Sequence, residues 1–276
     1  MKFDPSANIP DLSGKVILVT GGTAGIRKES IIAFAKHNPE RIYFTGHDSE
    51  HVAVIITEAK TSATSVLVIF LPCDMTSLKS VEASTKQIIS ESHQLDILMC
   101  NAGVMAVPPA LTQDGYEIQF GTNHITHALL IKLLLPTLLH TADVSDSDIR
   151  IVTLTGQGFT WHPRGGIIFK DLQTKQSSML SAAHYGQSKL ANLLYAAELA
   201  RQYPQITSLS VHAGVVWTGL IEKSSGFTKV LMHIVSPFSM MTPAEGAHNQ
   251  LWAAMGNKTN MVNGAYYEPV WLPRRT

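Results

Sequence analysis

The sequence predicts an α/β protein: one domain spanning residues 1–276, built on a doubly wound parallel sheet of about seven strands flanked by helices. Short apolar runs of strand length alternate with longer segments of helical periodicity along most of the chain. The runs lack strict apolar–polar alternation, which is typical of strands buried on both faces. With 276 residues, 45% of them hydrophobic, the chain can bury a core of that size.

In the first half of the chain, each predicted strand is followed by a helix. The first helix stops at Asn38-Pro39, because proline favours a helix end. Such an order predicts right-handed crossovers between parallel strands. The expected elements are strand Lys15–Thr20, helix Ile26–His37, strand Arg41–Thr45, helix Val52–Lys60, strand Ser65–Leu71, helix Leu78–Ser92 and strand Leu95–Cys100.

The second half continues this order with longer helices. One helix contains Pro136 near its end, and another is closed by Pro204. No segment has the composition of a linker, a repeat or a low-complexity region, so one domain is expected, with an elaboration after about residue 214. The expected elements are helix Ile118–Leu139, strand Arg150–Leu154, helix Tyr185–Tyr203 and strand Thr207–His212.

The charge balance excludes some classes of function. Lys and Arg total 21, as do Asp and Glu, and a nucleic-acid-binding protein normally has a basic surplus. Charged residues make up only 15% of the chain, which is compatible with a large subunit interface or an apolar cleft. Cys73 and Cys100 lie at the ends of apolar runs that are predicted to form buried strands, so we expect no disulfide framework and a reducing compartment. The sequence has no four-ligand Cys/His zinc pattern, so no metal site is expected.

No targeting or membrane segment is expected. The first 15 residues are polar and lack the apolar stretch of a signal peptide. The longest apolar segment, Ala128–Leu139, contains Lys132 and Pro136 and is too short to span a bilayer. We therefore expect a cytoplasmic protein.

A glycine-rich turn joins the first predicted strand to the first helix. It reads Thr-Gly-Gly-Thr-Ala-Gly-Ile over residues 20–26. Glycines at such a turn let the backbone approach a pyrophosphate group that sits at the helix N-terminus. The position between a strand and a helix is the context that a dinucleotide-binding turn requires.

Tyr185 and Lys189 are candidates for acid–base chemistry. They are four residues apart on one predicted helix and therefore share a face. A nearby ammonium group favours the phenolate and lowers the pKa of the tyrosine, which lets the phenol exchange a proton near neutral pH.

Together these motifs resemble those of the short-chain dehydrogenases/reductases. The glycine-rich turn, Asp74, Asn101-Ala102-Gly103, Asn123, Tyr185-Gly-Gln-Ser-Lys189 and His212-Ala-Gly214 follow one another in that family's order, from about Leu12 to Gly219. The run GYEIQFGTNHITHALL is similar to retinol-dehydrogenase-like and WW-domain-oxidoreductase-like members and to fungal biosynthetic-pathway reductases.

The resemblance implies a Rossmann-type fold and NADP(H)-dependent oxidoreduction. Tyr185 would be the general acid/base, Lys189 would tune it, and Asn123 would support a proton-relay water. The cofactor would be held by the pyrophosphate turn, the adenine and ribose contacts and the nicotinamide contacts. These positions are Gly21, Gly25, Ile26, Arg27, His47, Asp74, Asn101, Gly103, Lys189, Val215 and Thr218.

Three positions depart from the family pattern. Arg27 stands where the turn normally has its last glycine, and its charge either occupies the cofactor's place or grips its phosphates. His47 stands where NADP-preferring members have an arginine, whose planar fork holds the 2′-phosphate.

The third departure concerns the substrate oxygen. Gly156 replaces the catalytic serine that ends the fifth strand, and Thr155 should face the other way, because neighbours in a strand point to opposite faces. Losing one oriented hydrogen-bond donor typically lowers the rate on the order of a hundred- to a thousandfold.

The substrate side is expected to be apolar. Residues 219–245 form the family's variable substrate lid and are rich in Met, Phe, Val and Ile, which suits a hydrophobic small molecule. A helix hairpin packed for folding or for contact with a membrane surface is the alternative. Candidate residues lining the cleft are Met105, Gly156, Gln157 and Trp161.

Three functions follow. The first is NADP(H)-dependent oxidoreduction of a hydrophobic carbonyl or alcohol. The second is a repurposed non-redox enzyme with a degenerate cofactor site, an isomerase, dehydratase or cyclase of natural-product (secondary metabolite) biosynthesis, using Tyr185 as acid/base. The third is a non-catalytic binding protein. Family relatives form homodimers or tetramers through the two long helices, and we expect the same here.

Overall fold

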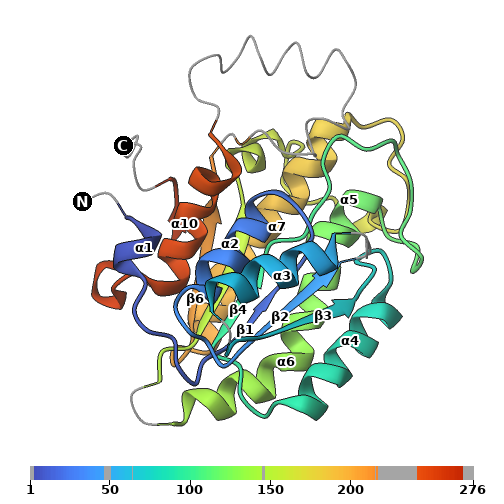
Figure 1. Cartoon of the computed structure of the whole chain (residues 1–276). Coiled ribbons are helices and arrows are strands. Elements are labelled where there is room, and N and C mark those ends of the chain that lie inside the picture. Colours follow the sequence, from blue (N-terminus) through green and yellow to red (C-terminus); the bar gives the residue numbers. More distant parts are fainter. Residues whose placement is uncertain are drawn as a thin grey trace.

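The computed structural model describes residues 3–46, 51–63, 65–144, 147–214, 216 and 241–269. Seven strands in these residues form one parallel sheet in the order β3-β2-β1-β4-β5-β6-β7 (Figure 1). The predicted fold class is therefore confirmed. The strands are β1 (Val16–Val19), β2 (Arg41–Gly46), β3 (Leu67–Pro72), β4 (Ile97–Cys100), β5 (Arg150–Thr155), β6 (Thr207–His212) and β7 (Tyr266–Tyr267).

Helices cover both faces of this sheet. The described long helices alternate with the strands as the sequence predicts, and shorter helical turns lie between them. The bounds are α1 (Pro5–Asn8), α2 (Gly25–Ala35), α3 (Val52–Ser62), α4 (Leu78–Glu91), α5 (Ile118–Phe120), η1 (Gly121–Ile125), α6 (Thr126–Ala142), η2 (Gln157–Trp161), η3 (Phe169–Asp171), α7 (Ser181–Gln202), α10 (Pro243–Met255) and η4 (Lys258–Asn260).

The core has two layers because successive strand residues point to opposite faces of the sheet. In β1, Ile17 and Val19 join a cluster with α2, α3 and α10, whereas Val16 and Leu18 join a second cluster with α4, α6 and α7. All four side chains are buried. The continuous apolar runs predicted to be strands are thus buried on both sides, as the absence of alternation indicated.

The helix predicted over Ile118–Leu139 is three elements. It begins as α5, passes through the π-helical turn η1, and continues as α6 to Ala142. Pro136 does not end this helix. Proline has no N–H to pair with the carbonyl of Lys132, but both residues lie on the exposed face of the helix. The run Ile118–Ala142 is long and apolar enough to cross a membrane by length and composition alone, but here it packs against α4 as a core helix.

Two other boundaries differ from the prediction. Helix α7 starts at Ser181, one turn before Tyr185, where the sequence has no apolar periodicity. The predicted lid, residues 219–245, lies mostly outside the described residues, and its last three residues belong to α10. Thr242 caps that helix in a capping box with Glu245, and Pro243 occupies its first turn.

Candidate active site

The candidate site residues follow the carboxyl ends of neighbouring strands. The glycine-rich turn follows β1, Asn101–Gly103 follows β4, Gly156 follows β5 and His212 ends β6. Strands β1 and β4 are adjacent at the point where the strand order reverses. Ligands of open α/β sheets bind at this switch point, so the topology gathers the predicted residues at the expected edge.

The turn after β1 leaves helix α2 open at its start. Gly21 and Gly25 have φ of 69° and 61°, a left-handed conformation that glycine adopts without strain. Helix α2 begins at Gly25, and Ala24 provides no side-chain cap. The first N–H groups of the helix, including that of Ile26, therefore lack a partner within the helix and can receive an anion.

Arg27 lies over this turn. Its Nε donates to the carbonyl of Ala24 at 3.3 Å. A Cβ added to Gly21 would lie 3.0 Å from Arg27 Nη1 and 3.1 Å from Ala102. The guanidinium thus covers the glycine that would face a pyrophosphate, and burial lowers its pKa.

The segment after β4 is tied to β1. Thr20 Oγ1 accepts hydrogen bonds from the N–H groups of Asn101 and Ala102, at 2.8 and 2.9 Å. The side chain of Asn101 donates to Gln250 Oε1 of α10 at 3.0 Å, and its buried Oδ1 has no partner among the described residues. The predicted ribose residues are therefore held rigidly beside the turn.

Asn123 connects the β4 loop to α7 from the π-helical turn. Its Oδ1 accepts from Val104 N at 2.8 Å, and its Nδ2 donates to Val104 O at 3.0 Å and to Ser188 Oγ at 2.9 Å. A Cβ on Gly103 would lie 2.9 Å from Asn123 Oδ1 and 3.8 Å from Lys189 Nζ, so only glycine fits between them. This side chain therefore fixes the distance between the β4 loop and the Lys189 helix.

Tyr185 and Lys189 lie together on α7. Lys189 Nζ donates to Leu154 O at 2.9 Å and is 5.5 Å from the centre of the Tyr185 ring. Thr155 Oγ1 donates to the carbonyl of Lys189 at 2.8 Å. The sequence predicts that Thr155 points to the face opposite the position of the missing serine, and in the structure its hydroxyl is directed at the backbone of α7.

Burial dominates the electrostatics of this pair. The pKa of Lys189 is lowered to about 7, mainly by burial and further by the charge of Arg27. Burial raises the pKa of the Tyr185 phenol to about 12, although part of the side chain is exposed. The expected lowering of the tyrosine pKa is therefore wrong for this arrangement, because burial raises it and the neighbouring amine, with a pKa of about 7, is only partly charged at neutral pH.

Gly156 leaves a gap at the end of β5. Its φ of 171° is extended backbone that any residue adopts. Among the described residues, a Cβ added there would meet only His212, at 3.3 Å from Nδ1 and 3.7 Å from Cε1. The conformation that a serine needs is thus present, and the side chain is missing.

The other predicted residues occupy the rim. Gln157 Nε2 reaches Glu268 Oε1 at 3.4 Å, and the Trp161 ring lies 6.3 Å from that of Tyr185. Met105 is half-buried in the β4 loop. Asp74 accepts from Thr76 and Gln113 and so stabilises the turn after β3. His47, Val215 and Thr218 lie outside the described residues.

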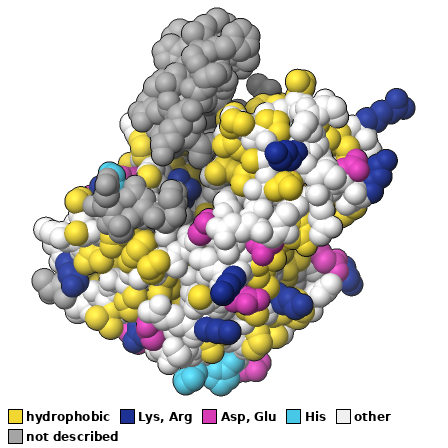
Figure 2. All heavy atoms as spheres, turned by 90° about the vertical axis from the view of Figure 1, so that its right-hand side faces the viewer, with side chains coloured by type: hydrophobic (Ala, Val, Ile, Leu, Met, Phe, Trp, Pro, Cys, Tyr) yellow, Lys and Arg dark blue, Asp and Glu magenta, His cyan; other side chains and the backbone are white. Residues whose placement is uncertain are grey.

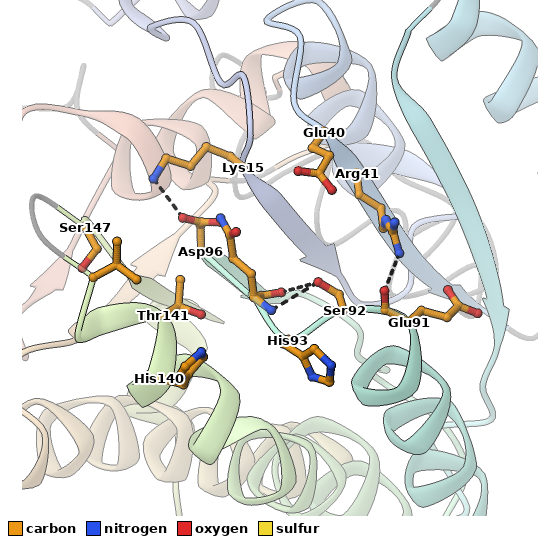
Figure 3. A pocket seen from close by; sticks show the side chains of 12 residues that line it. Lys15, Glu40, Arg41, Glu91, Ser92, His93, Asp96, His140, Thr141 and Ser147 are labelled. Carbon is orange, nitrogen blue, oxygen red and sulfur yellow. Dashed lines mark hydrogen bonds and ion pairs between the residues drawn. The ribbon is translucent and has the colours of Figure 1, made fainter.

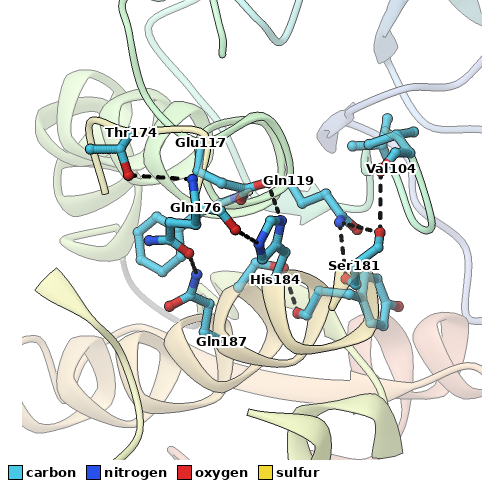
Figure 4. Close-up of polar contacts among 12 residues, drawn as sticks. Val104, Glu117, Gln119, Thr174, Gln176, Ser181, His184 and Gln187 are labelled. Atoms are coloured by element: carbon cyan, nitrogen blue, oxygen red, sulfur yellow. Dashed lines mark hydrogen bonds and ion pairs between the residues drawn. The ribbon is translucent and has the colours of Figure 1, made fainter. Parts of the chain in front are cut away.

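A buried network beside Tyr185 escaped the sequence analysis (Figure 4). His184 Nδ1 lies 3.1 Å from Glu117 Oε1, and both side chains are fully buried. His184 Nε2 contacts the carbonyl of Gln176 at 3.1 Å, and Gln187 donates to the side chain of Gln176 at 2.7 Å. The network fixes the first turn of α7 next to Tyr185. No spacing rule marks it, because its members come from distant segments.

A separate hollow of about 470 Å³ lies at the opposite edge of the sheet (Figure 3). Lys15 pairs with Asp96 there at 2.9 Å, and Arg41 donates to the carbonyl of Glu91. The hollow is at the amino ends of the strands, away from Tyr185. Because ligands of such sheets bind at the carboxyl ends, it is not the candidate active site.

The comparison with protein families agrees with this geometry. A family model described as short chain dehydrogenase matches residues 15–227. The chain belongs to the short-chain dehydrogenase/reductase family. It is a retinol-dehydrogenase-like member and, like its homologues, an enzyme of the oxidoreductase type.

Curated relatives align over almost the whole chain. An uncharacterized oxidoreductase of Schizosaccharomyces pombe is 35% identical, with 95% of this chain and 79% of that protein covered. A short-chain dehydrogenase/reductase of Armillaria gallica is 35% identical, covering 95% and 83%. Retinol dehydrogenase 12 of Mus musculus is 34% identical, covering 96% and 81%.

The fold also matches a solved short-chain type dehydrogenase/reductase from Mycobacterium marinum. The TM-score is 0.73 at 21% identity, with 95% of this chain and 96% of that chain covered.

Short-chain dehydrogenases/reductases generally use nicotinamide cofactors, and the residues present fit the phosphates of one. The left-handed glycines and the uncapped start of α2 provide backbone donors, and Arg27 adds a cation. Residues 20–27 contain no carboxylate that would repel an anion. Arg27 must turn from the glycines toward the bound phosphates for this fit.

Proposed function

We propose that the chain is an NADP(H)-dependent oxidoreductase that interconverts a hydrophobic alcohol and its carbonyl compound. The observation that carries this proposal is the joint placement of Asn123, Tyr185 and Lys189. A Cβ added to Gly103 would lie 2.9 Å from Asn123 Oδ1 and 3.8 Å from Lys189 Nζ, so both side chains face this glycine. The nitrogen of Lys189 also lies 5.5 Å from the centre of the Tyr185 ring. These are the side chains that the family uses for proton transfer, and here partly buried hydrogen bonds hold Asn123 and Lys189 in place.

When bound, the nicotinamide ring gives hydride to, or takes it from, the reacting carbon. Tyr185 supplies the matching proton to the carbonyl oxygen or removes it from the alcohol. Lys189 favours the phenolate when it is charged. Because Arg27 lowers the pKa of Lys189, an anion paired with Arg27 raises that pKa and restores the ammonium.

The preference for NADP(H) over NAD(H) rests on the resemblance to NADP-dependent members of the family. Arg27 and Lys189 are close enough for their charges to interact. Arg27 lies at the pyrophosphate turn, so its charge favours the phosphates that both cofactors share, whereas the family recognises the additional 2′-phosphate of NADP(H) at the position of His47.

A hydrophobic substrate fits the surface that follows Gly156. The segment between β5 and α7 carries three exposed apolar side chains. These are Trp161, Phe169 and Leu180, which are 50%, 72% and 80% exposed. Figure 2 shows hydrophobic side chains near the upper edge of the face it draws and also across its lower half. Exposed apolar groups beside polar catalytic residues are typical of a site for an apolar ligand. The names of the retinol dehydrogenases support a hydrophobic alcohol as the substrate class.

A non-redox isomerase, dehydratase or cyclase is the second candidate. One observation favours it: Arg27 Nη1 lies over Gly21, where a pyrophosphate would approach. Such an enzyme would use Tyr185 as acid/base on a substrate held in the same apolar cleft.

Calorimetry with NADPH and NADH, followed by turnover assays, tests the proposal. We expect NADPH to bind more tightly, and the bound protein to reduce geranial, a hydrophobic allylic aldehyde, with loss of NADPH absorbance. Tyr185→Phe should abolish turnover and leave NADPH binding in place. Absence of binding to either cofactor would contradict the proposal and favour the non-redox candidate.

A further inference from the structure

A buried histidine joins the cofactor turn to the π-helical turn. His127 is the second residue of α6, four residues after Asn123, and its side chain is buried. Its Nδ1 lies 3.0 Å from the backbone carbonyl of Asn123, and its Nε2 lies 2.9 Å from Oγ1 of Thr20, which directly follows β1. One ring therefore spans the distance between two segments that carry the candidate site.

The partners of this ring determine which of its nitrogens carries the hydrogen. A carbonyl oxygen only accepts hydrogen bonds, so Nδ1 must donate to the carbonyl of Asn123. The Thr20 hydroxyl already accepts from the N–H groups of Asn101 and Ala102, which uses both of its lone pairs. Its own hydrogen remains to be donated, and Nε2 at 2.9 Å is closer than the carbonyl of Met99 at 3.4 Å. The geometry thus assigns Nδ1 as the donor and Nε2 as the acceptor of a neutral ring.

The surroundings keep the ring neutral. The pKa of His127 is lowered to about 4, mainly by burial; the hydrogen bond to Asn123 opposes this shift, and the charges of Lys189 and His124 add to it. A protonated ring would also bring a third donor to the Thr20 hydroxyl, which has only two lone pairs. His127 therefore keeps one protonation state near neutral pH, which suits a fixed link and not a proton carrier.

These hydrogen bonds form one continuous chain from the β4 loop to α7. The N–H of Ala102 donates to Thr20, the Thr20 hydroxyl donates to His127, and His127 donates to Asn123. The side chain of Asn123 in turn donates to Ser188, which precedes the lysine of the site. All five residues are buried. Removing a member leaves a buried donor or acceptor unpaired, which costs more than the loss of the bond alone.

We propose that His127 is a positioning residue, which as the neutral Nδ1–H tautomer fixes the cofactor turn, through Thr20, relative to Asn123 and the proton-transfer side chains of α7. The inference rests on the proposed function, because it assigns a positioning role within that same site. His127 acts through its two hydrogen-bond partners. Breaking the link on the Thr20 side should therefore affect cofactor binding, and breaking it on the Asn123 side should affect the chemical step.

Nuclear magnetic resonance of the full chain labelled with ¹⁵N-histidine tests the link without turnover. The His127 signals are assigned from their loss in His127→Gln. We expect the Nδ1–H tautomer and no titration of the ring near neutral pH, because its pKa is about 4. Thr20→Val, which removes the hydroxyl, should shift the Nε2 resonance, whereas Thr20→Ser, which keeps it, should not. An Nε2–H tautomer, or the same response to both Thr20 variants, would overturn the inference.

Two substitutions break the link at opposite ends. The amide of glutamine reaches the position of Nε2 and accepts from Thr20, but it no longer donates to Asn123; the shorter asparagine does the reverse. For His127→Gln we expect kcat with geraniol to fall about tenfold, and the Kd of NADP⁺ to stay within about twofold of the wild-type value. For His127→Asn we expect the Kd of NADP⁺ to rise about tenfold, and kcat at saturating NADP⁺ to stay within about twofold.

A merely structural role of His127 predicts the same changes of kcat and Kd in both variants. That outcome in folded proteins, judged by circular dichroism and melting temperature, would overturn the inference. The controls are His140→Gln and His140→Asn, because His140 is exposed on the last turn of the same helix. Both control variants should behave as wild type.

The failure of this inference and the failure of the proposed function are distinguishable. If the wild-type chain turns over geraniol but the two variants show no opposite split, the proposed function stands and the role of His127 is wrong. If the wild-type chain does not turn over geraniol, the proposed function fails for this substrate class. In that case the tautomer of His127 and its response to the two Thr20 variants still decide the inference.

Discussion

The side chain of Arg27 determines whether the glycine-rich turn is accessible to a bound anion. Its guanidinium covers Gly21 and interacts with the charge of Lys189. The neighbouring Lys28 instead pairs with Glu58 at 2.6 Å on another side of α2. Adjacent cations on one helix therefore have different functions, and only the first is placed to contact bound phosphates.

Replacing Arg27 by glycine restores the residue that the family has at this position. We expect Arg27→Gly to weaken NADPH binding about tenfold, a change of about 1.4 kcal/mol, because a charge-assisted contact with phosphate is lost. Calorimetry in low salt measures this change, and Lys28→Gln is the matched control. Tighter binding by the glycine variant would mean that the arginine closes the site.

The pH dependence of the free enzyme should also respond to Arg27. A neighbouring cation disfavours the ammonium form, so Arg27→Gln raises the pKa of Lys189 above about 7. Lys189 then stays charged to higher pH. We expect the alkaline limb of the kcat/KM profile to move to higher pH in Arg27→Gln. An unmoved limb would show that Lys189 does not control it.

At the residue scale, the sequence indicated which positions matter but not how they are arranged. Gly156, Tyr185 and Lys189 were identified from pattern alone. The contact between Gly156 and His212 was not, because it depends on the register of β5 and β6. The sequence predicted a lowered pKa for Tyr185, whereas burial raises it. Helical spacing indicates a charged neighbour but gives no information about desolvation.

At the element scale, the π-helical turn η1 is the main difference between the predicted helix Ile118–Leu139 and the observed one. Apolar periodicity cannot show a π turn, because the apolar face continues through it into α6. The turn nevertheless carries Asn123 and begins at Gly121. An added Cβ at Gly121 would lie 2.4 Å from Thr112 Cγ2, too close for any side chain. The packing of the Thr112 loop therefore helps to place Asn123.

This contact gives a test of the turn. We expect Gly121→Ala to destabilise the protein by about 1–3 kcal/mol, the usual effect of overpacking, and to lower activity through displacement of Asn123. Thr112→Ser removes the Cγ2 methyl group but keeps the hydroxyl that accepts from Tyr116 N. The double variant should regain most of the stability in urea unfolding. Equal losses in the single and double variants would contradict the proposed clash.

At the scale of the whole molecule, alternation of strands and helices was sufficient to predict the parallel sheet. The apolar runs that end at Cys100 and Thr155 are buried on both faces, as their composition required. Strand β7 was not located, because two residues, Tyr266 and Tyr267, carry no periodicity. Its place beside β6 brings Glu268 next to Gln157 at the rim of the candidate site.

We propose that the chain forms a homodimer or tetramer through α6 and α7, as the family resemblance implies. Leu194 on α7 is 51% exposed, an apolar side chain suited to such an interface. We expect Leu194→Glu to shift a dimer toward monomer in sedimentation experiments, because a buried unpaired charge opposes association. Leu67→Glu is the matched control, since Leu67 is 50% exposed at the edge strand β3, the far end of the sheet from β5 and β6. If both variants sediment like the wild type, the dimer does not use this face of α7.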